Sequence, residues 1–129
     1  MTRSENETAI TLELVLDEAM LQQLSKYLTK AELEQSIREF LVDANVILTE
    51  VEAALVDKNV TVATRAFHTL KGNSRTLGAN ALAALCQGAE NELKKTADLS
   101  DRSLILQQLA GLISQYSVAV RLAGYCTSE

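Results

Sequence analysis

Apolar side chains recur every three or four residues along most of this chain. The clearest run consists of Leu33, Ile37, Phe40, Ala44, Ile47, Val51 and Leu55. Steps of three and four place side chains on one stripe of a helix. The chain also contains no proline and is rich in residues that propagate helices, such as leucine, alanine and glutamate. The pattern therefore predicts an all-α fold that contains one long helix.

Turn signals divide the chain into five helical segments. We expect a short helix over about 18–28 with Asp17 as its N-cap, the long helix ending at "VDKN" (56–59), a helix over about 60–77, another after "GAN" (78–80), and a last one over about 101–123 with Ser100 as its N-cap. Short links make neighbouring helices antiparallel. The prediction is an antiparallel up-down-up-down four-helix bundle with the short N-terminal helix across one end. Residues 1–14 lack periodicity, so we expect a flexible N-terminal tail and one domain over 15–125.

Composition narrows the class of partner. A formal charge of −5 argues against nucleic acid and against an anionic membrane, because both attract basic surfaces. The N-terminus has no apolar core of a signal peptide, and no apolar run approaches the roughly 20 residues that span a bilayer. We expect a soluble, cytoplasmic monomer. Cys86 lies inside an apolar helical pattern, which predicts a buried thiol.

The single histidine, His68, lies on an outward face. The inward positions of its helix are Ala63, Ala66, Leu70 and Leu77. At about 100° per residue, His68 points roughly 160° away from that group. A core histidine is therefore disfavoured, and an idle surface histidine is the simple alternative.

Cations gather on the same face. Lys71, Gly72 and Arg75 follow His68 at offsets of three, four and seven, and Arg65 lies at the edge of the face. No Asp or Glu occurs between Lys58 and Glu90. This environment suits an anion that forms on the histidine.

The chemistry that fits is phosphoryl transfer. A neutral imidazole nitrogen can attack phosphorus, and the phosphoryl group that it takes up carries nearly two negative charges. Lys71 can pair with that group, and Gly72 leaves room one turn further on. A glycine inside a helix costs about 1 kcal/mol relative to alanine, which suggests a steric reason for Gly72. The alternative for Gly72 is a tight contact between helices.

The segment "FHTLKGNSRTLGANALAALCQGAE" (67–90) resembles the signature of histidine-containing phosphotransfer (HPt) domains. Their pattern is roughly H-x-L-K-G-x-S-x-x-L-G-A followed by L-x-x-x-C-x-x-x-E. The resemblance implies an antiparallel helical bundle that relays phosphoryl groups between aspartates of receiver domains. It also implies that the expected domain over 15–125 is an HPt domain.

Site roles follow from the same resemblance. It makes His68 the phospho-acceptor, Lys71 the neighbour of the phosphoryl group and Gly72 the clearance position. Glu90 lies about 80° off the inward stripe of its helix and could border His68. A carboxylate that accepts Nδ1–H fixes the tautomer and leaves Nε2 free to attack. A solvated glutamate is the alternative, and Gln87 is a second candidate for the hydrogen bond.

The resemblance also implies the partners. We expect a phosphoryl carrier of a multistep relay that accepts from the receiver of a hybrid sensor kinase and donates to a response regulator. Arg65 and Arg75 would meet the acidic pocket of the receiver. The protein would need no cofactor or metal of its own, because Mg²⁺ belongs to the receiver.

Two other classes compete with this interpretation. An enzyme with a metal or nucleotide site is disfavoured, because the lone histidine has no E-x-x-H or zinc spacing and the chain has no P-loop. We therefore expect no autonomous kinase activity. A helical adaptor that binds receivers without carrying phosphate is the second alternative.

Overall fold

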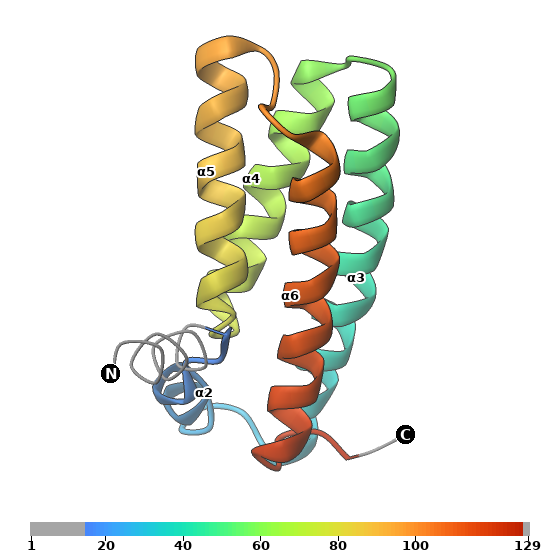
Figure 1. Ribbon diagram of the computed structural model, residues 1–129. Helices are drawn as coiled ribbons and strands as arrows, with labels where there is room; N and C mark the ends of the chain where they lie inside the picture. The colour runs from blue at the N-terminus through green and yellow to red at the C-terminus, as the bar shows by residue number, and fades with distance from the viewer. Residues whose placement is uncertain (1–14, 128–129) are drawn as a thin grey trace, which may run out of the picture.

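Helices make up most of the computed structural model, which describes residues 15–127 (Figure 1). They are α2 (Glu18–Leu24), α3 (Lys30–Val56), α4 (Val60–Thr76), α5 (Asn80–Thr96) and α6 (Arg102–Leu122). No strand occurs within the described range. The predicted all-α class is therefore confirmed. The tail predicted for residues 1–14 lies outside the described residues.

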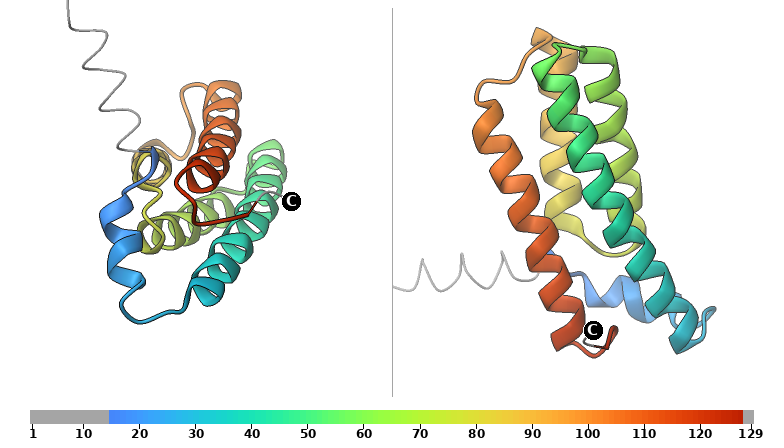
Figure 2. Two further views of the ribbon diagram at one scale, coloured as in Figure 1. Left: turned by 90° about the horizontal axis from the view of Figure 1, so that it is seen from below. Right: turned by 90° about the vertical axis from the view of Figure 1, so that its right-hand side faces the viewer.

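The four long helices lie side by side, and successive helices run in opposite directions (Figure 1). Helices α3 and α5 each contact both α4 and α6, so the order around the bundle follows the chain. The short α2 lies at the end where α3 begins and α6 finishes (Figure 2). This arrangement sets α4 directly against α5.

Side-chain caps explain where most helices begin. Asp17 accepts a hydrogen bond from the backbone N–H of Met20, as predicted for the N-cap of α2. The N-cap predicted at Ser100 is wrong. Asp101 caps α6 through a 3.0 Å hydrogen bond from the N–H of Leu104, while the backbone N–H of Ser100 donates to Glu92. Both positions carry a capping side chain, and the bond to Glu92 holds Ser100 outside the helix.

The core follows the predicted stripe of α3, with one shift in α6. All seven predicted α3 positions are buried, and the thiol of Cys86 is fully buried as expected. In α6 the apolar spacing of Ile105, Leu109, Leu112, Tyr116 and Val120 favours Leu112 as an inward position, but Ile113 is buried and Leu112 is half-buried. Tyr116 lies in the core, where its hydroxyl donates a 2.7 Å hydrogen bond to the carbonyl of Leu77. That bond satisfies the phenol in an otherwise apolar interior.

The turn between α4 and α5 depends on Gly78. Its φ of +75° lies in the left-handed region, and a Cβ there would lie 2.7 Å from the backbone oxygen of Asp17. The backbone N–H of Asp17 donates to the carbonyl of Gly78 at 2.7 Å, and Asn80 donates to the Asp17 carboxylate. The start of α2 is thus fastened to the tight turn between α4 and α5.

One described helix, α6, has the length and apolar composition of a membrane span. Glutamines and serines interrupt its apolar residues, so it contains no continuous apolar run of that length. One such helix is weak evidence for a membrane segment, because helices of bundle cores share these properties. Here α6 packs against α3 and α5 with Leu109, Ile113, Tyr116 and Val120 buried.

Candidate functional site

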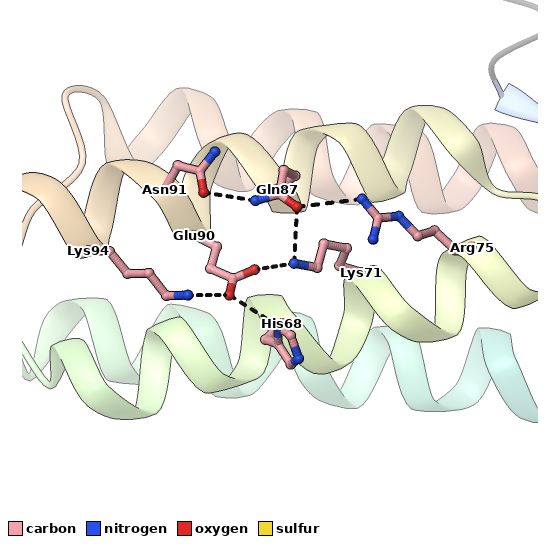
Figure 3. Close-up of polar contacts among 7 residues, drawn as sticks. All are labelled: His68, Lys71, Arg75, Gln87, Glu90, Asn91 and Lys94. Atoms are coloured by element: carbon pink, nitrogen blue, oxygen red, sulfur yellow. Dashed lines mark hydrogen bonds and ion pairs between the residues drawn. The ribbon is translucent and has the colours of Figure 1, made fainter.

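His68 lies on the outer face of α4. Its side chain is 65% exposed, although the preceding Phe67 and the following Leu70 are fully buried. Within residues 15–127 the imidazole has one hydrogen-bonding contact, through Nδ1. The other ring nitrogen, Nε2, points away from that contact (Figure 3). The predicted outward orientation of His68 is confirmed.

Glu90 on α5 makes that contact. Its Oε2 lies 3.1 Å from Nδ1 of His68, and its side chain is only 3% exposed. The solvated glutamate considered above is therefore excluded. The close antiparallel pair of α4 and α5 covers a carboxylate that helical geometry alone placed at the edge of the inward stripe.

Lys71 holds the other oxygen of this carboxylate. Its Nζ donates to Oε1 of Glu90 at 2.7 Å and to Oε1 of Gln87 at 3.0 Å. The Lys71 side chain is 10% exposed, so it does not extend from the open face beside His68 as its sequence offset suggested. It lies in the space between α4 and α5, where the buried carboxylate compensates its charge.

A second cation, Lys94, reaches Oε2 of Glu90 at 3.0 Å (Figure 3). Its side chain is 62% exposed. Lys94 is not among the site residues predicted from the sequence. The signal was present, because Glu90 and Lys94 have the i, i+4 spacing of helical ion pairs. The link from this pair to His68 is a tertiary contact.

The cluster keeps Glu90 ionised. The hydrogen bond from Lys71 is the main cause that lowers the pKa of Glu90 from its ordinary value of 4.5 to about 2, against the opposing effect of burial. Hydrogen bonds from Lys94 and His68 lower this pKa further. Cys86 lies nearby, and burial together with the charge of Glu90 raises its pKa to about 12. At neutral pH the carboxylate is charged and the thiol is not.

Gly72 leaves open space one turn from His68. A Cβ placed on Gly72 would have no neighbouring atom within 4 Å. The alternative reason for this glycine, a tight contact between helices, is therefore excluded. A group that approaches His68 meets a bare helix surface here.

The remaining predicted residues lie around this cluster. Arg75 contacts Oε1 of Gln87 at 3.5 Å, and Gln87 donates to Asn91 at 2.8 Å. Gln87 thus accepts hydrogen bonds from Lys71 and Arg75, whereas Glu90 makes the contact with Nδ1 of His68. Arg65 lies elsewhere, in an open groove of about 480 Å³ between α3 and α4 that Glu50 also lines. Arg65 therefore lies on the side of α4 that faces α3, whereas Glu90 contacts His68 from α5.

Metal ligands do not gather in the described structure. Within residues 15–127, no group of three or more His, Cys, Asp and Glu side chains is placed to hold an ion. The charged groups around His68 contact one another instead.

Comparison with known families decides the assignment. The sequence model of a family described as "Hpt domain" matches residues 35–119, which is more than half of the chain. The chain belongs to the Hpt domain family. A search of curated proteins and a search of solved structures each gave no match. The matched segment contains all of α4 and α5, and with them the whole cluster around His68.

Membership gives the general role. Hpt domains act in two-component phosphorelays, where a histidine carries the phosphoryl group and receiver domains are the partners. The recognition of an HPt domain from residues 67–90 is therefore confirmed.

Proposed function

We propose that this protein is a phosphoryl carrier of a multistep His–Asp phosphorelay, with His68 as the acceptor. The donor is the phospho-aspartate of a receiver in a hybrid sensor kinase, and the next acceptor is the receiver aspartate of a response regulator. One observation carries the proposal: an exposed imidazole whose Nδ1 contacts a buried, ionised carboxylate and whose Nε2 faces outward.

The transfer step follows from this geometry. Glu90 accepts the Nδ1–H hydrogen bond, so the neutral ring has its lone pair on Nε2. Nε2 attacks the phosphorus, the N–P bond forms and the O–P bond of the aspartyl phosphate breaks. The electron pair of that bond stays on the aspartate carboxylate, and the Nδ1 proton remains between His68 and Glu90. The reverse sequence passes the phosphoryl group to the next receiver.

Lys71 supports this step through Glu90. Because its ammonium donates to Glu90 and to Gln87, it fixes the carboxylate that orients the ring. The contact with the phosphoryl group that the family resemblance implies requires the Lys71 ammonium to turn toward His68. Its third N–H is the donor left for that contact.

The docking face extends along α4 on both sides of His68. Gly72 gives the receiver close access, while Arg65 and Arg75 offer cations to its acidic phosphorylation pocket. The groove between α3 and α4 continues this face beyond Arg65. Docking should therefore weaken as salt is raised, because exposed charges are screened.

Further parts of the proposal concern the whole protein. We infer a cytoplasmic monomer, an antiparallel up-down-up-down bundle over 15–125 with α2 across one end, and no autonomous kinase activity. Mg²⁺ belongs to the receiver, and the carrier contributes no cofactor of its own.

Radiolabel transfer from phosphorylated receivers tests the proposal. Wild-type protein should take up label that is labile in acid and stable in alkali, as expected for a phosphoramidate bond, whereas His68→Gln should take up none. A helical adaptor would bind the same receivers with or without His68 and would take up no label in either form. Label at the wild-type level on His68→Gln would exclude His68 as the carrier.

A further inference from the structure

The oxygen that contacts His68 is shared. Oε2 of Glu90 lies 3.1 Å from Nδ1 of His68 and 3.0 Å from Nζ of Lys94. The opposite oxygen, Oε1, is occupied by Lys71 at 2.7 Å. One buried carboxylate therefore has two lysines and one imidazole as donors (Figure 3).

The two lysines differ in what they can do to the ring. Lys71 is almost fully buried and is held by Glu90 and Gln87, so it anchors the carboxylate. Lys94 is largely exposed and contacts the same oxygen as the imidazole. Only Lys94 competes directly with Nδ1–H for that oxygen.

The balance of charge gives the consequence. Beside Glu90 alone, the doubly protonated imidazolium would be favoured, because an opposite charge within hydrogen-bonding distance stabilises the charged form. Imidazolium has no lone pair on Nε2 and cannot attack phosphorus. A cation on Oε2 reduces this preference in two ways, because it occupies the acceptor and repels a second positive charge.

The other charged groups described near the cluster do not contact Oε2 of Glu90. From α4, Lys71 faces Oε1 and Arg75 is bound to Gln87, while Arg65 lines the groove on the side of α3. From α5, the thiol of Cys86 is uncharged, since burial raises its pKa to about 12. Among the described residues, neither α3 nor α6 contributes a charged group to the contacts of Glu90.

We propose that Lys94 is a positioning residue that keeps His68 in the neutral, nucleophilic form by sharing Oε2 of Glu90 with the imidazole. The inference deepens the proposed function and rests on it. It assigns to an exposed lysine on α5 a role at a reacting nitrogen on α4.

Nitrogen-15 NMR of the full chain tests this role without any phosphoryl transfer. The protein has one histidine, so its ring signals are unambiguous. At pH 6.5, Lys94→Met should raise the ratio of imidazolium to neutral imidazole about two- to fivefold, the range expected for one exposed ion pair. Lys94→Arg should restore the wild-type ratio. Lys95→Met is the matched control, because Lys95 is an exposed neighbour of equal charge, and it should leave the ratio unchanged.

A rate measurement extends the test to function. Phosphoramidate, a small reagent that phosphorylates imidazole nitrogen, should modify Lys94→Met more slowly than wild type at pH 6.5 and equally fast at pH 8.5. Because only the neutral ring reacts, the loss of rate at pH 6.5 should be smaller than the rise of about two- to fivefold in the imidazolium ratio. The proposal is overturned if the imidazolium ratio of Lys94→Met matches that of Lys95→Met or falls below it. It is also overturned if the rate of Lys94→Met is reduced equally at both pH values. If the ratio rises as predicted but His68 accepts no phosphoryl group in any variant, the proposed function fails and the effect of Lys94 on the ring stands.

Discussion

Glu90 reaches across from α5 to place its Oε2 3.1 Å from Nδ1 of His68, although 22 residues separate the two in the chain. The contact joins a 3% exposed carboxylate to a 65% exposed imidazole. A fixed, buried acceptor therefore orients a ring that is otherwise open to solvent and to a partner. The proposed phosphoryl transfer depends on this asymmetry.

The tautomer of His68 should depend on Glu90. In wild type at pH 9 the neutral ring should carry its proton on Nδ1, and Glu90→Gln should keep this state because the amide retains an oxygen acceptor. Glu90→Ala should lose the preference, and its phosphoryl acceptance should slow by up to about tenfold, or 1.4 kcal/mol. Nitrogen-15 shifts of Nδ1 and Nε2 report the tautomer. Identical shifts in wild type and Glu90→Ala would show that the contact does not orient the ring.

Clearance at Gly72 should matter for transfer and not for folding. Gly72→Ala should stabilise the protein by up to about 1 kcal/mol, because a Cβ there meets no atom within 4 Å and alanine favours helix. Gly72→Gln should fold normally and slow transfer from a receiver strongly. The control is Gly111→Gln on α6, which should transfer normally. A Cβ on Gly111 also meets no atom within 4 Å, but this position lies away from His68. Normal transfer by Gly72→Gln would remove the steric role of this position.

The two lysines on Glu90 should differ in their effect on stability. Lys71→Met should lower the free energy of unfolding by about 3 kcal/mol, because it leaves a buried carboxylate with an empty oxygen. Lys94→Met should cost less than about 1 kcal/mol, since that pair is exposed at the lysine. Urea titration measures both values. Equal losses would contradict the different burial of the two side chains.

The low pKa of Glu90 predicts a pH dependence of stability. A carboxyl whose pKa falls on folding, here from 4.5 to about 2, stabilises the fold above pH 4.5, and that contribution disappears as the pH drops toward 2. The difference in unfolding free energy between wild type and Glu90→Gln should therefore shrink over this window by up to about 3 kcal/mol. Glu34 also has a pKa lowered to about 2, chiefly by a backbone hydrogen bond from Thr127, but both proteins share it. A difference that stays constant from pH 6 to pH 2 would contradict the lowered pKa.

Features that depend on neighbouring residues in the chain were predictable from the sequence. The stripe of α3, the outward direction of His68 and the turn at Gly78 all follow from helical spacing and local backbone preference. The capping error at Ser100 arose because Asp101 next to it is an equally good cap.

Features that need a second helix were only partly predictable. Spacing placed Glu90 near the edge of the α5 stripe, but its burial requires α4 to pack across it. Lys71 shares the helical face of His68 by sequence offset, yet its long side chain turns into the interface to reach Glu90. The pair of Glu90 and Lys94 was visible at i, i+4, whereas its connection to His68 was not.

The most direct test is to locate the phosphoryl group on the modified protein. After phosphorylation by a receiver, phosphorus-31 and nitrogen-15 NMR should show one N–P bond, on Nε2 of His68, with the proton still on Nδ1 beside Glu90. His68→Gln should show no such bond and should keep the helical circular dichroism and melting temperature of wild type, because the side chain is exposed. A phosphoryl group on Nδ1, on another residue, or on the His68→Gln variant would contradict the account.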